Sequence, residues 1–176
     1  YVAHSNYPGV PMVSSVEIWD AGTLRHVGSH SFGIHSGSAT WIDFHEGSWW
    51  VAFVNYENRG GVAGRGVEWS TLERFDADWR QTGGWVFPPG VVERFRPYSN
   101  SGGFWGAGGL LYLTGHDAAE IYPLRLPTAG SVLQWTGTIP APIAGQGIGP
   151  DPADPRIVYA IDRVKRRGIV VRLPAG

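Results

Sequence analysis

The 176-residue sequence contains no cysteine. Neither a disulfide framework nor a thiolate metal site can therefore form. No stretch of the sequence is apolar over the length of a membrane-spanning helix, and no basic-then-apolar signal segment is recognisable. The lack of cysteine is compatible with the cytosol, which we slightly favour, but it also fits an exported protein that is stable without disulfides. The sequence thus leaves the localisation open.

Charge is also scarce, with 16% charged residues and a formal net charge of −1. A nearly neutral protein has no global field that attracts nucleic acid or an anionic membrane, so we expect neither as a partner. The one basic cluster, from Arg163 to Arg167, lies between two strand-like runs. We interpret this cluster as a solvated hairpin turn that protects a sheet edge.

The sequence has one Met but 26 Gly, 13 Pro and 9 Trp. A helical protein would carry more Ala, Leu, Glu and Lys at helical spacing, whereas this composition is typical of a turn-rich all-β protein.

A strand-turn-strand pattern recurs about every 50 residues, which is a period typical of β-propeller blades. In each recurrence a polar residue closes the same strand. The four runs are Tyr1–His4, Trp50–Asn55, Leu111–His116 and Val158–Asp162.

We divide the chain, as one propeller segment, into units of approximately 1–36, 37–99, 100–144 and 145–176. The first unit is expected to open on its second strand, and the last unit to stop one strand short. The fold prediction is a partial β-propeller of about three and a half to four blades. It would belong to a ring of about five or six blades, completed by a missing upstream segment or by a second chain.

Four short motifs carry a resemblance to a known group of enzymes. They are Asn100-Ser101-Gly102-Gly103, Gly145-Gln146-Gly147-Ile148, the run from Leu111 to Asp117, and the run from Val158 to Asp162. With them the chain resembles the five- and six-bladed enzymatic propellers, which include the gluconolactonase/SMP-30 group and the plant-type glutamine cyclotransferases. It is also similar to uncharacterised bacterial propeller proteins. It departs from WD40 propellers, because no Gly-His…Trp-Asp pair recurs. The resemblance implies a polar central channel.

Polar residues at two sets of strand ends are candidates for that channel. Those at strand starts are His35, Asn100 and Gln146, and those at strand returns are His4, Asn55, His116 and Asp162. The return set could hold one divalent metal ion, since imidazole suits zinc, manganese or iron, and an oxygen-rich set suits calcium. The metal would polarise a carbonyl or activate water. The alternative is that these residues only cap strands and satisfy loop backbone groups.

His116 and Asp117 are also candidates for a general base and its carboxylate partner, because histidine changes its charge near neutral pH. Asn100, Gln146 and Trp105 are candidates for substrate binding, although most of the tryptophans are expected to pack between blades.

Two functions remain open from the sequence. The first is an enzyme that acts on a small polar molecule in the channel, of lactonase, cyclase or lyase type and possibly metal-assisted. The second is a non-catalytic propeller that binds a protein or a carbohydrate on its rim.

Overall fold

The structure is a computed structural model that describes residues 1–143 and 146–174. It divides into two compact units, Tyr1–Val86 and Phe87–Gly176. The described residues of the two units form four antiparallel sheets, two in each unit, and none of these sheets is closed. The predicted all-β class and partial propeller-like fold are therefore confirmed. Gly145, which belongs to a predicted strand start, and the end of the last predicted unit at 175–176 lie outside the described residues.

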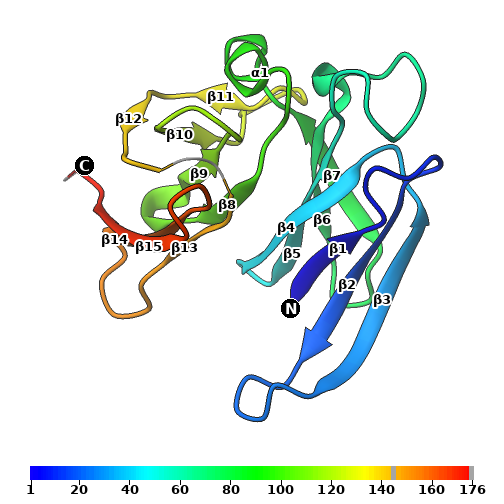
Figure 1. Cartoon of the computed structure of the whole chain (residues 1–176), viewed down its shortest axis with the longest axis horizontal. Helices are drawn as coiled ribbons and strands as arrows, with labels where there is room; N and C mark the ends of the chain where they lie inside the picture. The colour runs from blue at the N-terminus through cyan, green and yellow to red at the C-terminus, as the bar shows by residue number, and fades with distance from the viewer. Residues whose placement is uncertain (144–145, 175–176) are drawn as a thin grey trace. The chain divides into compact units, whose positions relative to one another are not determined.

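The first unit begins with a three-stranded sheet in the order β1-β2-β3 (Figure 1). Its strands are β1 (Val2–Ser5), β2 (Val13–Trp19) and β3 (His26–Ile34). Val16 on β2 is fully buried, while its neighbours Ser15 and Glu17 point to the opposite, more open face.

The second sheet of this unit has four strands in sequence order, β4-β5-β6-β7. They are β4 (Ser38–His45), β5 (Ser48–Val54), β6 (Thr71–Phe75) and β7 (Gln81–Val86), with a short 3-10 helix at Val67–Trp69 before β6. The central strand β5 is almost continuously apolar, as a strand covered on both faces must be. On one face, Phe53 and Val51 pack with Ala39 and Phe75.

β1 is an edge strand of its sheet, and β2 is the central one. β1 lies against β4, and the Ser5 and Ser38 hydroxyls are 2.5 Å apart (Figure 1). Edge strand β8 lies against edge strand β13 in the same way in the second unit. The first sheet therefore has an edge strand next to the neighbouring sheet. The expectation that this sheet opens on its second strand and lacks an innermost one stays a prediction.

The second unit starts with a short helix, α1 (Pro89–Phe95), which the sequence did not predict. Val91, Val92 and Phe95 are buried on one face of this helix. Proline at the start of a helix is tolerated, because its missing N–H would have no partner there.

The larger sheet of this unit runs β11-β10-β9-β8, and β12 also pairs with β10. Its strands are β8 (Gly102–Trp105), β9 (Leu111–Thr114), β10 (Glu120–Arg125), β11 (Gln134–Trp135) and β12 (Ile139–Pro140). The two short strands β11 and β12 lie on either side of Gly137, a residue type that weakens strands.

The last sheet is β13-β14-β15. Its strands are β13 (Ile148–Pro150), β14 (Ile157–Asp162) and β15 (Arg167–Arg172). One face, with Val158, Ala160 and Val171, packs in a common core with Phe104 and Ile121 of the larger sheet. In the described part of the chain, no helix is long and apolar enough to cross a membrane.

Candidate functional site

The loop that follows β9 carries His116 and Asp117. Gly115 brings this loop close to α1, since a Cβ atom at Gly115 would lie 3.1 Å from Cδ1 of Phe95. A larger residue would push the strand end away from the helix, so glycine sets the position of the loop that starts at His116.

The imidazole of His116 is held on two sides. Its Nδ1 lies 2.6 Å from Oδ1 of Asp117, and its ring stacks on Tyr98 with the ring centroids 3.8 Å apart. Tyr98 lies in the segment between α1 and β8. The His116 side chain is 15% exposed, so it is shielded but still open to a small molecule.

Arg163, in the hairpin between β14 and β15, reaches the same place. Its Nη2 is 3.2 Å from Nδ1 of His116 and 3.5 Å from Oδ1 of Asp117. One Nδ1 cannot donate to the carboxylate and accept from the guanidinium at once. The short contact with a charged oxygen favours an Nδ1–H that donates to Asp117, with Arg163 as a counter-charge to Asp117. This tautomer leaves Nε2 of His116 as a proton acceptor.

The three residues predicted to bind substrate lie in this same unit. Asn100 is buried, and its amide nitrogen donates to the carbonyls of Gly102 (2.9 Å) and Thr114 (2.8 Å), so it ties β8 to β9. Trp105 is 8% exposed and lies in the core. Gln146 is partly exposed, and its backbone carbonyl accepts from the Thr114 hydroxyl at 3.0 Å. Of the three, Gln146 is the one whose side chain is open to a ligand.

Asp162 ends β14 and is buried. Its Oδ1 accepts from the backbone N–H of Lys165 at 3.0 Å. Its Oδ2 is 3.6 Å from Nε of Arg167 and 4.0 Å from Nζ of Lys165. Both carboxylate oxygens thus contact groups of the hairpin, and the side chains of Lys165 and Arg167 balance the negative charge of Asp162.

His4 and Asn55, the other two predicted metal ligands, belong to the first unit. His4 is exposed on the edge strand β1, opposite Ser15. Asn55 is buried, and its amide nitrogen donates to the Trp69 carbonyl at 3.2 Å. Its Oδ1 has no hydrogen-bond partner among the described residues.

The residues present give a poor fit to a metal centre. Asp162 is already neutralised by Lys165 and Arg167, which compete with a cation for its oxygens. Within the described residues, no three His, Asp or Glu side chains gather in a way that could hold a metal ion. The metal set of His4, Asn55, His116 and Asp162 stays a prediction, and we derive no chemistry from it.

A second imidazole and carboxylate meet in the first unit, where His35 was considered from the sequence and Glu73 was missed. Nε2 of His35 is 3.4 Å from Oε1 of Glu73, and the His35 ring stacks on Phe53 at 3.6 Å. Glu73 is buried, and Nδ1 of His35 is enclosed. The His35–Glu73 contact is longer than the 2.6 Å contact between His116 and Asp117, and its carboxylate is buried, so we assign this pair no catalytic role.

Tyr98 and Arg163 were also missed as site residues. Arg163 lies 47 positions from His116, and its hairpin was interpreted only as edge protection. A basic side chain directly after the polar end of a strand is the one sequence signal that could have pointed to it.

Comparison with known proteins gives a likeness of fold. No protein-family model and no curated protein matches the chain. A "putative 6-phosphogluconolactonase" from Bacteroides uniformis matches with a TM-score of 0.54 and 10% identity, over 99% of this chain and 50% of that chain. A luciferin-regenerating enzyme matches with a TM-score of 0.48 and 11% identity, over 94% of this chain and 76% of that one. The chain thus spans about half the length of the first structure. At 10% identity, the first likeness shows that the fold is of this kind and shows nothing of the reaction.

Proposed function

We propose that the protein is a propeller enzyme that hydrolyses a small polar lactone, with His116 as the general base and Asp117 as the carboxylate that orients it. The observation that carries the proposal is the 2.6 Å contact between Nδ1 of His116 and Oδ1 of Asp117. A fold likeness to a protein named as a lactonase supports the choice of reaction.

The residues supply each step of such a hydrolysis. Nε2 of His116 takes a proton from water, and the water oxygen attacks the lactone carbonyl carbon. The guanidinium of Arg163 lies 3.5 Å from Oδ1 of Asp117, on the Nδ1 side of the ring, and balances the charge of the carboxylate that orients His116. The ring C–O bond then breaks, and His116 returns the proton to the leaving alkoxide. Lactone and water thus give one hydroxy acid, and the enzyme is regenerated.

Other residues of the second unit would orient the substrate. Among the predicted binding residues, Gln146 is the one that is partly exposed. Asn100 and Trp105 are buried and would help only indirectly, by holding β8 in position. Tyr98 keeps the imidazole plane fixed by stacking.

The alternative is a non-catalytic propeller that binds a protein or a carbohydrate on its rim. One observation favours it: aromatic side chains gather at the surface of the first unit, well away in sequence from His116.

We also propose that the propeller is completed by further sheets, from an upstream segment or from a second chain. The matched lactonase-like structure is about twice as long as this chain, which supports this proposal.

The test is hydrolysis of a panel of sugar lactones, followed as acid release at constant pH. We expect saturable hydrolysis of at least one lactone by the wild type, and a roughly hundredfold lower kcat for Asp117→Asn, which loses the charge that orients His116. Asp151→Asn, which removes an exposed carboxylate paired with Tyr159, is the matched control and should keep full activity. Equal activity in Asp117→Asn and the wild type would exclude the proposed role of the pair.

A further inference from the structure

Five aromatic side chains form a strip at one end of the layer between the two sheets of the first unit. They are Tyr1, His30, Phe44, Trp49 and Trp79. Trp49 and Trp79 stack with an angle of 11° and centroids 5.4 Å apart, and Trp79 and His30 stack with an angle of 8° at 4.6 Å. The rings come from separate strands and turns, so the fold assembles the strip.

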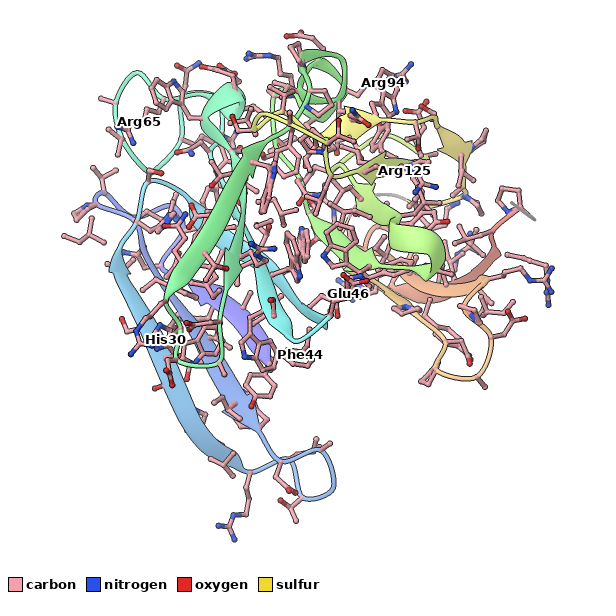
Figure 2. All side chains as sticks on the ribbon, turned by 180° about the vertical axis from the view of Figure 1, so that it is seen from behind. His30, Phe44, Glu46, Arg65, Arg94 and Arg125 are labelled. Atoms are coloured by element: carbon pink, nitrogen blue, oxygen red, sulfur yellow. The ribbon has the colours of Figure 1, made fainter. Side chains whose placement is uncertain are left out.

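One end of the aromatic strip faces solvent. Tyr1 and Phe44 are each 55% exposed, and both pack against Trp49. The ring centroids are 4.2 Å apart for Tyr1 and Trp49 and 4.7 Å apart for Phe44 and Trp49. Figure 2 labels His30 and Phe44, which belong to opposite ends of the strip. The exposed rings are packed from behind by other rings, so they form a rigid platform that needs no rearrangement to bind a ligand.

The backbone at Trp79 adds an independent observation. Trp79 has a φ of 61°, a left-handed conformation that bulky residues rarely adopt. Asp76 holds this turn through its Oδ1, which accepts from the N–H groups of Asp78 and Arg80 at 2.9 Å each. Glycine or asparagine would suit the position better, so the indole is kept at a conformational cost, as happens at binding sites.

The polar residues around the strip define the ligand chemistry. Glu46, two positions after Phe44, has a side chain that is 84% exposed, whereas Asp78 beside Trp79 is 69% exposed and pairs with Arg80 at 2.8 Å. Burial lowers the pKa of His30 below its ordinary value, which favours the uncharged ring. Rings bordered by the exposed carboxylate of Glu46 disfavour anions and suit a ligand with apolar faces and hydroxyl donors.

We propose that the aromatic strip binds a neutral oligosaccharide. The apolar face of a sugar ring stacks on Phe44 and Tyr1, and hydroxyl groups of the sugar donate to the carboxylate of Glu46. A protein partner is the less suitable occupant, because Tyr1 and Phe44 are the two large hydrophobic side chains of the strip that are exposed, and the exposed carboxylate of Glu46 follows them in the turn after β4. This site shares no residue with the proposed lactonase site, so either proposal can fail without the other.

The test is isothermal titration of the purified protein with cellohexaose, maltohexaose and chitohexaose, and with heparin as an anionic probe. We expect saturable binding of at least one neutral hexaose and no binding of heparin. Phe44→Ala should weaken binding about tenfold, which corresponds to roughly 1.4 kcal/mol for the lost ring stacking. Trp19→Ala, which removes a 45% exposed indole on β2 outside the strip, is the matched control and should bind as the wild type does.

Two further variants keep the test decisive. Trp79→Gly removes the ring and suits the positive φ, and Glu46→Gln changes a carboxylate on a side chain that is 84% exposed, so it leaves the core untouched. Both should weaken binding while thermal unfolding stays cooperative. Saturable binding of none of the three neutral hexaoses, tighter binding of heparin, or unchanged affinity in Phe44→Ala and Glu46→Gln would each overturn the proposal.

Discussion

Single residues decide the chemistry that we assign to the second unit. His116 is useful only because Asp117 fixes one tautomer, Tyr98 fixes the ring plane and Arg163 balances the charge. Both carboxylate oxygens of Asp162, by contrast, contact groups of its own hairpin. Two polar residues at the ends of similar strands thus have different roles, and the difference lies in their partners.

A metal prediction belongs to this scale. Because Lys165 and Arg167 neutralise Asp162, we expect calcium, magnesium, manganese and zinc, added one at a time after EDTA, to leave the thermal midpoint unchanged. An ion that binds the folded state selectively would raise the midpoint with its concentration. A saturable rise that disappears in His116→Ala would contradict this expectation and support the predicted metal set.

At the scale of strands and sheets, close backbone contacts fix how neighbouring sheets meet. Gly102 opens β8, and a Cβ atom there would lie 2.7 Å from the carbonyl oxygen of Gln146 and 2.9 Å from the N of Ile148. These neighbours are backbone atoms, which cannot rotate away.

Gly102→Ala should therefore lower the free energy of unfolding by roughly 1–3 kcal/mol, the usual cost of overpacking. Gly149→Ala in β13 is the control, because nothing lies within 4 Å of the added Cβ. Urea unfolding monitored by circular dichroism compares the two variants. Equal midpoints for both would show that β8 and the segment before β13 are not so closely packed.

Stability should also depend on pH through the stack of His30 on Trp79. Burial lowers the pKa of His30 in the folded state, so the unfolded chain takes up a proton first as the pH falls. The contribution of His30 is complete above the unfolded pKa and is lost as the pH falls through the lowered folded pKa.

Urea midpoints at about pH 7.5 and about pH 5, on either side of the ordinary histidine range, measure this effect. We expect the wild type to lose more stability between them than His30→Gln. Equal losses in the two proteins would assign the acid sensitivity to other groups.

The elements that the sequence predicted best are those with strong local signals. β4 to β7 follow from apolar runs separated by turn residues such as Glu46-Gly47 and Asp76-Ala77-Asp78. Helix α1 was missed because Pro88, Pro89 and Gly90 signal a break, while its burial depends on tertiary packing. Within the site, His116-Asp117 was visible as neighbouring residues. Its contact with Arg163 was not, because pairing over 47 positions depends on how strands are ordered.

At the scale of the whole molecule, the outer face of the last sheet marks where further structure would pack. Tyr159 and Val170 are neighbours across β14 and β15, and together with Ile161 they leave an apolar face exposed. The opposite face of the same sheet is buried in the core of the second unit.

If a second copy completes the propeller, the wild type should self-associate in sedimentation equilibrium, and Val170→Lys should weaken that association. Leu24→Lys, which changes a side chain that is 76% exposed in the turn between β2 and β3, should have no effect. Wild-type protein that remains monomeric at every concentration would rule out the second copy and leave the upstream segment as the completing part.

The most direct test of the central claim is the initial rate of lactone hydrolysis by the wild type and by His116→Asn, measured side by side at saturating lactone. Asparagine keeps a polar side chain in the loop but cannot accept the proton, so we predict a rate about a hundred- to ten-thousandfold lower, with an unchanged thermal midpoint. His26→Asn, at an exposed histidine paired with Glu17 in the first unit, should retain the wild-type rate. A His116→Asn variant that hydrolyses the lactone as fast as the wild type would contradict the account.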